Sequence, residues 1–196
     1  GVVLRPYSTK PDDEMETEDL WVYQKIAEIA KQSTGYACVS TFHDFKYHPK
    51  KVTSGAFDDW IYDQLGAYSF TIELWDLPTK AGIENRKLIE WFRSHPHEDD
   101  LKILQWVEKH AEKDAYVSWY PFDHPQLGQV ELGGFNRLYT WTNPPPAYMG
   151  EEAARNLPFV LSLGDMLPCL TLHTLKLAQL GEDTYQIDLV VENSGF

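Results

Sequence analysis

Alternating apolar and polar residues predict a strand at residues 68–75 and a hairpin near the end of the chain. The two arms of the hairpin are residues 170–172 and 185–191, which flank a Gly-Glu-Asp turn at 181–183. Side chains with a period of two fall on opposite faces of a sheet. Because a lone hairpin is marginally stable in water, we expect this one to belong to a larger sheet whose other strands follow Phe196.

Shorter patterns earlier in the chain predict two more strands and two helices. The β-branched runs at 2–4 and 37–42 are typical of strands. Apolar residues spaced three and four apart predict a helix that ends at Gly35. A short helix at 58–65 is expected to end at Gly66. Strands that alternate with helices indicate an α/β fold.

The middle of the chain combines helical patterns with aromatic and proline-rich segments. Residues 84–113 contain two stretches with helical spacing. The segments 119–125 and 141–146 are rich in aromatic residues and proline, and apolar anchors recur every few residues. We therefore expect ordered loops rather than low-complexity sequence in these two segments.

Composition and charge narrow the classes of partner. The chain has 196 residues, of which 43% are hydrophobic and 14% aromatic, so it can bury a core. Its 17 Lys and Arg against 30 Asp and Glu give a net charge of −13, which argues against nucleic acid and anionic membranes as partners. No apolar run reaches the ~18 residues of a membrane span. The two cysteines leave the compartment open.

The strongest concentration of charge is the acidic segment at residues 12–19, which stands directly before a helical pattern. Carboxylates at the start of a helix interact favourably with its dipole. We interpret the segment as a solvated helix start. A calcium site is the alternative interpretation.

Glu73 is the first candidate for a functional residue. It lies in the second half of the strand pattern at 68–75, on the more polar face. A carboxylate buried in a sheet is costly unless it is paired or binds a ligand. Two interpretations follow, a buried structural ion pair or a site residue.

A specific set of residues surrounds Glu73. A Gly turn at 55, the pair Asp59-Trp60, Tyr62 and the run Ser-Phe-Thr-Ile-Glu-Leu at 69–74 follow one another closely. In this order and spacing they resemble the final catalytic segment of zinc metallocarboxypeptidases of the carboxypeptidase A/B type. The run Val-Val-Leu-Arg-Pro-Tyr at 2–7 is similar to the strand that follows the third zinc ligand of that family.

The resemblance implies a mixed-sheet zinc-carboxypeptidase-like α/β domain that removes C-terminal residues from peptides, with Glu73 as the general base. It places one zinc ligand, a His, about four residues before Gly1, and a His-x-x-Glu pair of ligands further upstream. We therefore expect zinc as the cofactor of the full-length protein, with no ligand in this chain. The expected partners are a peptide substrate and the missing N-terminal half of the domain. The chain alone should be inactive unless another chain supplies the metal site.

Three further residues gain expected roles from the resemblance. Asp58 stands two positions before Trp60, where the family sets its side-chain preference, and an Asp there implies substrates that end in Lys or Arg. The alternative is that Asp58 caps a helix that begins at Asp59. The position of the family's mobile active-site tyrosine falls on Lys51, four residues after Tyr47. Either a shift of the loop brings Tyr47 to the substrate or the tyrosine is absent.

The resemblance also suggests three parts of the chain. Residues 1–83 would be the C-terminal half of the catalytic domain, and 84–167 are similar to a helix and loop extension of large bacterial members. Residues 168–196 resemble the opening hairpin of a truncated β-sandwich domain. An extracellular or periplasmic location is favoured slightly over the cytoplasm.

Two other hypotheses compete for the functional residues. The sequence His-Pro-His-Glu at 95–98 has the spacing of a zinc motif, but it follows Glu73 and Pro96 interrupts it, so we reject it as the catalytic site. The rival function is a non-catalytic module that binds peptide or carbohydrate. Exposed aromatic residues such as Trp119 and Trp141 would then carry the binding.

Overall fold

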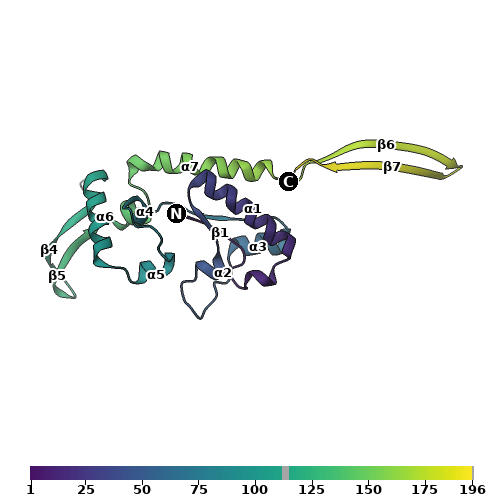
Figure 1. The fold of residues 1–196 in the computed structure, drawn as a ribbon. Coiled ribbons are helices and arrows are strands. Elements are labelled where there is room, and N and C mark those ends of the chain that lie inside the picture. Colours follow the sequence, from purple (N-terminus) through teal and green to yellow (C-terminus); the bar gives the residue numbers. More distant parts are fainter. Residues whose placement is uncertain (112–114, 196) are drawn as a thin grey trace. The chain divides into compact units, whose positions relative to one another are not determined.

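The computed structural model describes residues 1–111 and 115–195 of the chain (Figure 1). These residues form two compact units, Gly1–Arg155 and Asn156–Phe196. The fold is mixed α/β, as the sequence predicts, with one three-stranded sheet and two separate hairpins. None of the helices among the described residues has the length and hydropathy that crossing a bilayer requires.

The three-stranded sheet is formed by β1 (Val2–Arg5), β2 (Ala37–Ser40) and β3 (Thr71–Glu73) in the order β2-β1-β3. Strand β1 runs parallel to β2 and antiparallel to β3, so that Val2 lies between Ala37 and Glu73. All four residues of β1 are buried, which explains the apolar run Val2–Leu4, while the buried Arg5 pairs with Asp12. The outer edge of β2 has no strand partner among the described residues.

Strand β3 is shorter than the alternating pattern at 68–75. The expectation that this pattern has one buried apolar face is wrong at its end, because Leu74 is 51% exposed while Trp75 is 6% exposed. The physical reason is a change in backbone direction, since Trp75 adopts a φ of 70° and leaves the strand geometry. Glu73 is therefore the last residue of the strand.

Two helices of this region were expected, whereas α2 (Thr41–Asp44) begins inside the segment 37–42 that was expected to be a strand. The two long ones end where glycine was expected to end them, with φ of 74° at Gly35 and 62° at Gly66. A tyrosine cluster joins them, in which Tyr23 is fully buried and contacts Tyr62 edge to face. The helices are η1 (Asp12–Glu14), α1 (Thr17–Thr34), α2 (Thr41–Asp44) and α3 (Phe57–Leu65).

A second core holds the middle of the chain. Trp75 and Leu77 pack with Trp91, Ile103 and Val107 in one cluster of buried residues. The two helices predicted within 84–113 are present as α5 and α6. The elements of this part are α4 (Leu77–Lys80), α5 (Leu88–Arg93), α6 (His97–His110), β4 (Tyr116–His124), β5 (Gly128–Phe135) and η2 (Arg137–Thr142).

The expectation of a loop at 119–125 is wrong, because β4 and β5 form a hairpin, and the loop expected at 141–146 is confined to residues 143–145 between η2 and the helix that follows it. Prolines at 121 and 125 suggest a loop in the sequence, but a two-stranded ribbon tolerates proline at its open edges. At Gly133 a Cβ atom would lie 2.6 Å from the Cα of Trp119, so the strands approach too closely there for any other residue.

A long helix that the sequence analysis did not identify follows, α7 (Pro146–Asp165). The boundary between the two compact units falls within it. In the first unit, α7 contributes the buried Glu152, which accepts a hydrogen bond from the hydroxyl of Tyr36. Pro158 lies inside the helix. Because proline usually ends a helix, the sequence around Pro158 does not predict a long one.

The predicted terminal hairpin is confirmed as β6 (Leu170–Gly181) and β7 (Thr184–Asn193), joined at Glu182-Asp183. The pairing of Leu175 with Leu189 places large apolar side chains on one face of the ribbon. These side chains are each 51–65% exposed: Leu172, Leu175, Leu177, Tyr185, Ile187, Leu189 and Val191. That this hairpin opens a β-sandwich, and that the domain limits lie at 83 and 167, stay predictions.

Candidate functional site

Glu73 ends β3 and points its carboxylate to solvent. It is exposed, so the interpretation of Glu73 as a buried structural ion pair is wrong. The strand ends at this residue, and the next side chain, Leu74, is exposed as well. An exposed carboxylate at the end of a paired strand is held in place by the backbone of its neighbour and remains accessible to a ligand.

Tyr47 lies within electrostatic reach of Glu73. Its side chain is 64% exposed and belongs to the segment between α2 and α3. Partial burial and the negative charge of Glu73 both raise the pKa of the Tyr47 phenol. Lys51 is also exposed, and its backbone N–H donates to the carbonyl of His48 at 3.2 Å. Tyr47 and Lys51 were both considered for the position of the active-site tyrosine. Of the two, Tyr47 is the one on which the charge of Glu73 acts.

Asp58 is a buried carboxyl group at the start of α3. Its Oδ2 accepts a hydrogen bond from the Thr71 hydroxyl at 3.4 Å, and its backbone carbonyl accepts one from the Ser69 hydroxyl at 2.7 Å. Burial, and then the negative charge of Asp59, raise the pKa of Asp58. No Lys or Arg of the described residues forms an ion pair with it.

The alternative role of Asp58 as a helix cap is wrong in its position. Helix α3 begins at Phe57, and its N-cap residue is Ala56. Asp58 therefore lies inside the first turn, where its Oδ1 accepts the N–H of Asp59 at 3.1 Å. This bond satisfies one free amide of the turn but leaves the second carboxylate oxygen directed toward β3.

Asp58 of α3 contacts the face of β3 that carries the side chain of Glu73. Thr71, which contacts Asp58, is two residues before Glu73, and side chains two apart on a strand share a face. The spacing between such positions is about 7 Å. Asp58 is thus bonded to the strand that carries Glu73, and the charge of Glu73 acts on Tyr47, although the sequence separates these residues by up to 26 positions.

Sequence reasoning assigned no functional role to Asp59. In the structure its side chain connects α3 to the loop after β1. Its buried carboxylate accepts the N–H of Ser8 at 3.0 Å and the Ser8 hydroxyl at 2.6 Å, and Thr9 lies 3.5 Å away. These bonds tie the loop after β1 to the start of α3. The pair Ser8-Thr9 directly after the expected strand and Pro6 was the available signal.

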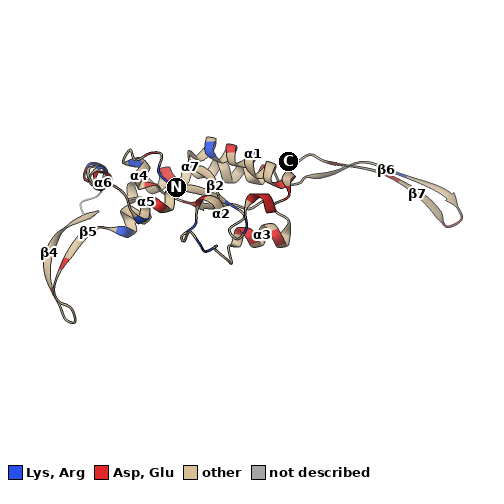
Figure 2. Cartoon of the chain, turned by 60° about the horizontal axis from the view of Figure 1, so that its bottom comes forward, with Lys and Arg blue, Asp and Glu red and all other residues tan. Residues whose placement is uncertain are grey.

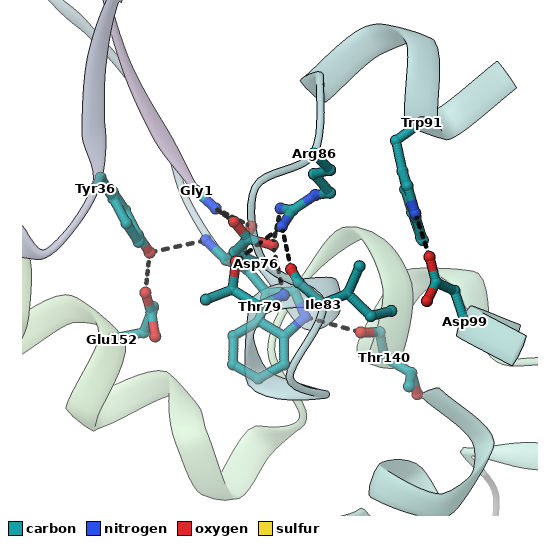
Figure 3. Close-up of polar contacts among 11 residues, drawn as sticks. Gly1, Tyr36, Asp76, Thr79, Ile83, Arg86, Trp91, Asp99, Thr140 and Glu152 are labelled. Atoms are coloured by element: carbon teal, nitrogen blue, oxygen red, sulfur yellow. Dashed lines mark hydrogen bonds and ion pairs between the residues drawn. The ribbon is translucent and has the colours of Figure 1, made fainter. Parts of the chain in front are cut away.

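A polar network fixes the chain just after β3 (Figure 3). Asp76 forms an ion pair with Arg86 and accepts the N–H of Thr79 at 3.1 Å. Burial acts to raise the pKa of Asp76, but the hydrogen bond and the charge of Arg86 outweigh burial and hold the pKa below its usual value. Trp75 donates its indole N–H to the carbonyl of Thr140 at 2.8 Å.

The histidines at 95 and 97 form no metal site. His95 has Nδ1 2.9 Å from the carbonyl oxygen of Trp91 and Nε2 2.9 Å from a carboxylate oxygen of Asp100. Among the described residues, no group of three or more His, Cys, Asp or Glu side chains could hold a metal ion. The placement of zinc ligands outside this chain stays a prediction.

Comparison with known proteins adds no assignment to this geometry. No protein-family model matches the chain. A search of curated proteins found no match either. The functional interpretation therefore depends on the residues and contacts described above.

Proposed function

We propose that residues 1–83 contribute to a zinc-dependent metallocarboxypeptidase in which Glu73 is the general base and Asp58 and Tyr47 contact the substrate. One observation carries the proposal. Asp58 is bonded to Thr71 on the strand of Glu73, and the charge of Glu73 acts on Tyr47. Each of the two expected substrate-binding residues is thus linked either to the strand of Glu73 or to the charge of Glu73 itself.

Glu73 has the properties that proton transfer requires. A carboxylate that is exposed and fixed by a strand can take a proton from an attacking water and pass it to the leaving amine. The resemblance puts the zinc ligands before Gly1, and among the described residues no group of three or more His, Cys, Asp or Glu side chains could hold a metal ion. The proposal therefore places the zinc ligands outside the chain and assigns Glu73 the proton steps alone.

Asp58 supports a preference for basic C-terminal residues. Its carboxyl group is buried, bonded to a hydroxyl and an amide, and without an ion pair from the described Lys and Arg side chains. A Lys or Arg side chain of the substrate would supply the missing positive charge and lower the raised pKa of Asp58. The preference should consequently weaken as the pH falls and Asp58 is protonated.

The test requires the natural upstream segment. The chain is expressed together with the protein segment encoded directly before Gly1, loaded with zinc, and assayed for release of C-terminal Lys, Arg or Leu. Glu73→Gln should lower kcat by about 10²–10⁴-fold with KM little changed, because it removes the general base. Asp58→Asn should retain turnover and lose the preference for Lys and Arg over Leu.

Three results would contradict the proposal. These are an upstream segment without a His and a His-x-x-Glu motif, full activity in Glu73→Gln, or turnover by the present chain alone. Asp13→Asn is the matched control for substitution of an acidic residue, because Asp13 is exposed and remote in sequence from the site.

A binding module remains the second candidate, and the structure sharpens its test. Trp119 is 60% exposed on β4, whereas Trp141 packs against the second core, with its ring 5.6 Å from that of Phe135. Trp119→Ala therefore probes binding, while Trp141→Ala disturbs the fold. Binding of a peptide or oligosaccharide that is lost in Trp119→Ala and kept in Glu73→Gln would favour this candidate. Trp21→Ala is the control, at 55% exposure on α1.

A further inference from the structure

A groove of about 1130 Å³ follows β2 in the first unit. It is lined by Tyr36 just before the strand, by Ala37 and Val39 within it, and by His43 and Pro49 beyond its end. Other lining residues come from α4, from α5 and the segment before it, and from the first half of α7. Since lining residues precede, belong to and follow β2, the groove runs along the strand, which is an edge strand of the sheet.

An edge strand offers unused backbone groups. In the order β2-β1-β3, strand β2 bonds to β1 on one side alone among the described residues. Outward N–H and C=O groups of such a strand can pair with an added extended segment. Main-chain pairing of this kind requires a peptide, because neither sugars nor phosphate polymers supply alternating amide donors and acceptors.

The charge of the groove is opposite to that of the chain. Seven Lys and Arg side chains line it against five Asp and Glu, although the whole chain carries −13. Figure 2 shows Lys and Arg near α4 and α5, whereas Asp and Glu dominate on α3. Two of the acidic side chains are neutralised in place, Asp76 by Arg86 and Glu90 by Lys87.

Three of the cations in the groove have no carboxylate partner. None of the ion pairs among the described residues involves Lys31 of α1, Lys46 of the segment after α2, or Arg93 of α5. The ammonium group of Lys46 lies 3.2 Å from the centre of the Phe42 ring, which restrains it. The three side chains come from three elements and line one groove.

We propose that this groove binds an extended peptide segment rich in Asp and Glu from another protein. The backbone of the segment pairs with the outer edge of β2, and its carboxylates contact Lys31, Lys46 and Arg93. A segment of six residues spans about 20 Å when extended, enough to pass the four residues of β2 and reach the loops at both ends. At physiological salt the screening length is about 8 Å, so the local cations outweigh the distant net charge.

The groove along β2 is distinct from the site at Glu73. Neither the residues that line the groove nor its charge depend on the proposed peptidase activity. None of Glu73, Asp58 and Tyr47 lines the groove. Glu73→Gln is therefore expected to bind the acidic peptide as the unaltered chain does. Failure of the peptidase proposal leaves this proposal intact, and the reverse also holds.

The experiment measures fluorescence anisotropy of a labelled octapeptide that alternates Glu with Val and Thr, titrated with the full 196-residue chain at 50 mM salt. Lys31→Glu and Arg93→Glu should each weaken binding about tenfold, since charge reversal replaces attraction by repulsion. Lys25→Glu is the matched control on the same helix. Lys25 does not line the groove, and its variant should bind within about twofold of the unaltered chain.

A second pair of peptides separates strand pairing from charge attraction. The same octapeptide with Gln in place of Glu should bind at least about tenfold more weakly, because its carboxylates are gone. An acidic octapeptide with N-methyl groups on alternate amides should weaken similarly, because it cannot donate to β2. Far-UV circular dichroism of each variant confirms that a loss of binding is not a loss of folding.

Four outcomes would overturn the proposal. They are no binding of the acidic peptide at millimolar concentration, equal affinities of Lys25→Glu, Lys31→Glu and Arg93→Glu, equal affinities of the methylated and unmethylated peptides, and inorganic polyphosphate that binds as tightly as the peptide. The first two refute the acidic ligand, the third refutes strand pairing, and the fourth refutes a peptide as the occupant.

Discussion

Two largely buried aspartates mark the two ends of β3, and their acidities are shifted in opposite directions. Asp58 contacts Thr71 at the start of the strand, and its pKa is raised by burial and by Asp59. Asp76 follows the end of the strand, and the contact with Arg86 holds its pKa low against the effect of burial. Burial alone therefore does not determine the charge of a carboxyl group in this fold. The neighbouring charge does.

The difference indicates that Asp76 is a structural residue and that the carboxyl group of Asp58 is available to a ligand. The carboxylate of Asp76 is engaged with a guanidinium and a backbone amide. The neighbours of Asp58 are a hydroxyl, an amide and a second carboxyl group. A buried carboxylate without a cation is a poor contributor to stability, so its presence is better explained by a ligand that brings the positive charge.

The largest expected effect is the loss of the ion pair at Asp76. Asp76→Asn should lower the free energy of unfolding by about 3 kcal/mol, because it leaves the mostly buried Arg86 guanidinium without its counter-charge. Urea unfolding followed by tryptophan fluorescence measures this loss, since every Trp lies in the first unit. Asp13→Asn, on an exposed residue, should change stability by no more than about 0.5 kcal/mol. Equal effects of the two substitutions would contradict the comparison.

Asp76 should also affect how the free energy of unfolding depends on pH in the acid range. Because the folded-state pKa of Asp76 is lower than its unfolded value, its contribution is present above about pH 4 and is lost as the pH falls through the folded pKa. Unfolding measured at stepped pH between about 6 and 2 should show a steeper decline for the unaltered chain than for Asp76→Asn. Parallel curves would show that another group controls acid unfolding.

His95 extends the comparison to a cation. Both ring nitrogens lie 2.9 Å from acceptor oxygens, one of Trp91 and one of Asp100, so the imidazolium satisfies both contacts and the neutral ring satisfies one. Burial lowers the pKa of His95, but the bonds to Asp100 and to the Trp91 carbonyl outweigh burial and raise it. Asp99 adds to this effect, and His97 also approaches Asp100, at 3.6 Å.

His95→Gln should cost about 1 kcal/mol at pH 5.5, where the imidazolium is present in both states. The stabilisation by His95 is complete below the unfolded pKa of about 6.5 and is lost as the pH rises through the raised folded value. Urea unfolding at pH 5.5 and pH 9 should therefore give a difference that shrinks at the higher pH. His97→Gln, on a fully exposed side chain, is the control and should change stability by no more than about 0.5 kcal/mol at pH 5.5.

The smallest expected effect is that of Asp58→Asn. The amide removes a buried negative charge beside Asp59, so at pH 7 the variant should be as stable as the unaltered chain or up to about 1 kcal/mol more stable. Because the folded pKa of Asp58 is raised, this advantage should disappear as the pH falls and the carboxyl group is protonated. A marked loss of stability at pH 7 would show that Asp58 is a structural residue like Asp76.

The parts of the fold that were predicted correctly have local signals. A glycine with positive φ ends α1 and α3, and β1 and the terminal hairpin have clear strand composition. In the parts that were not predicted, the local sequence signals conflict with the structure. Proline inside β4 and inside α7 suggested loops, and tertiary pairing and packing overrode that preference.

The candidate site was predictable to the extent that one short segment contains it. Asp58 and Glu73 lie within 16 consecutive positions, so a sequence comparison could relate them. The exposure of Glu73 and the hydrogen bonds of Asp59 depend on strand β1 and the loop after it, which are distant in sequence. The groove along β2 combines side chains from α1, α5 and α7, and no local pattern indicates such a combination.

The ribbon formed by β6 and β7 carries a large apolar face in contact with water. Such a surface gains free energy wherever it can leave water, including at the boundary between solution and air. In the thin films used for electron microscopy, the protein should therefore adsorb through this ribbon and present a narrow range of views. A small amount of mild detergent should restore the missing orientations by occupying the boundary first.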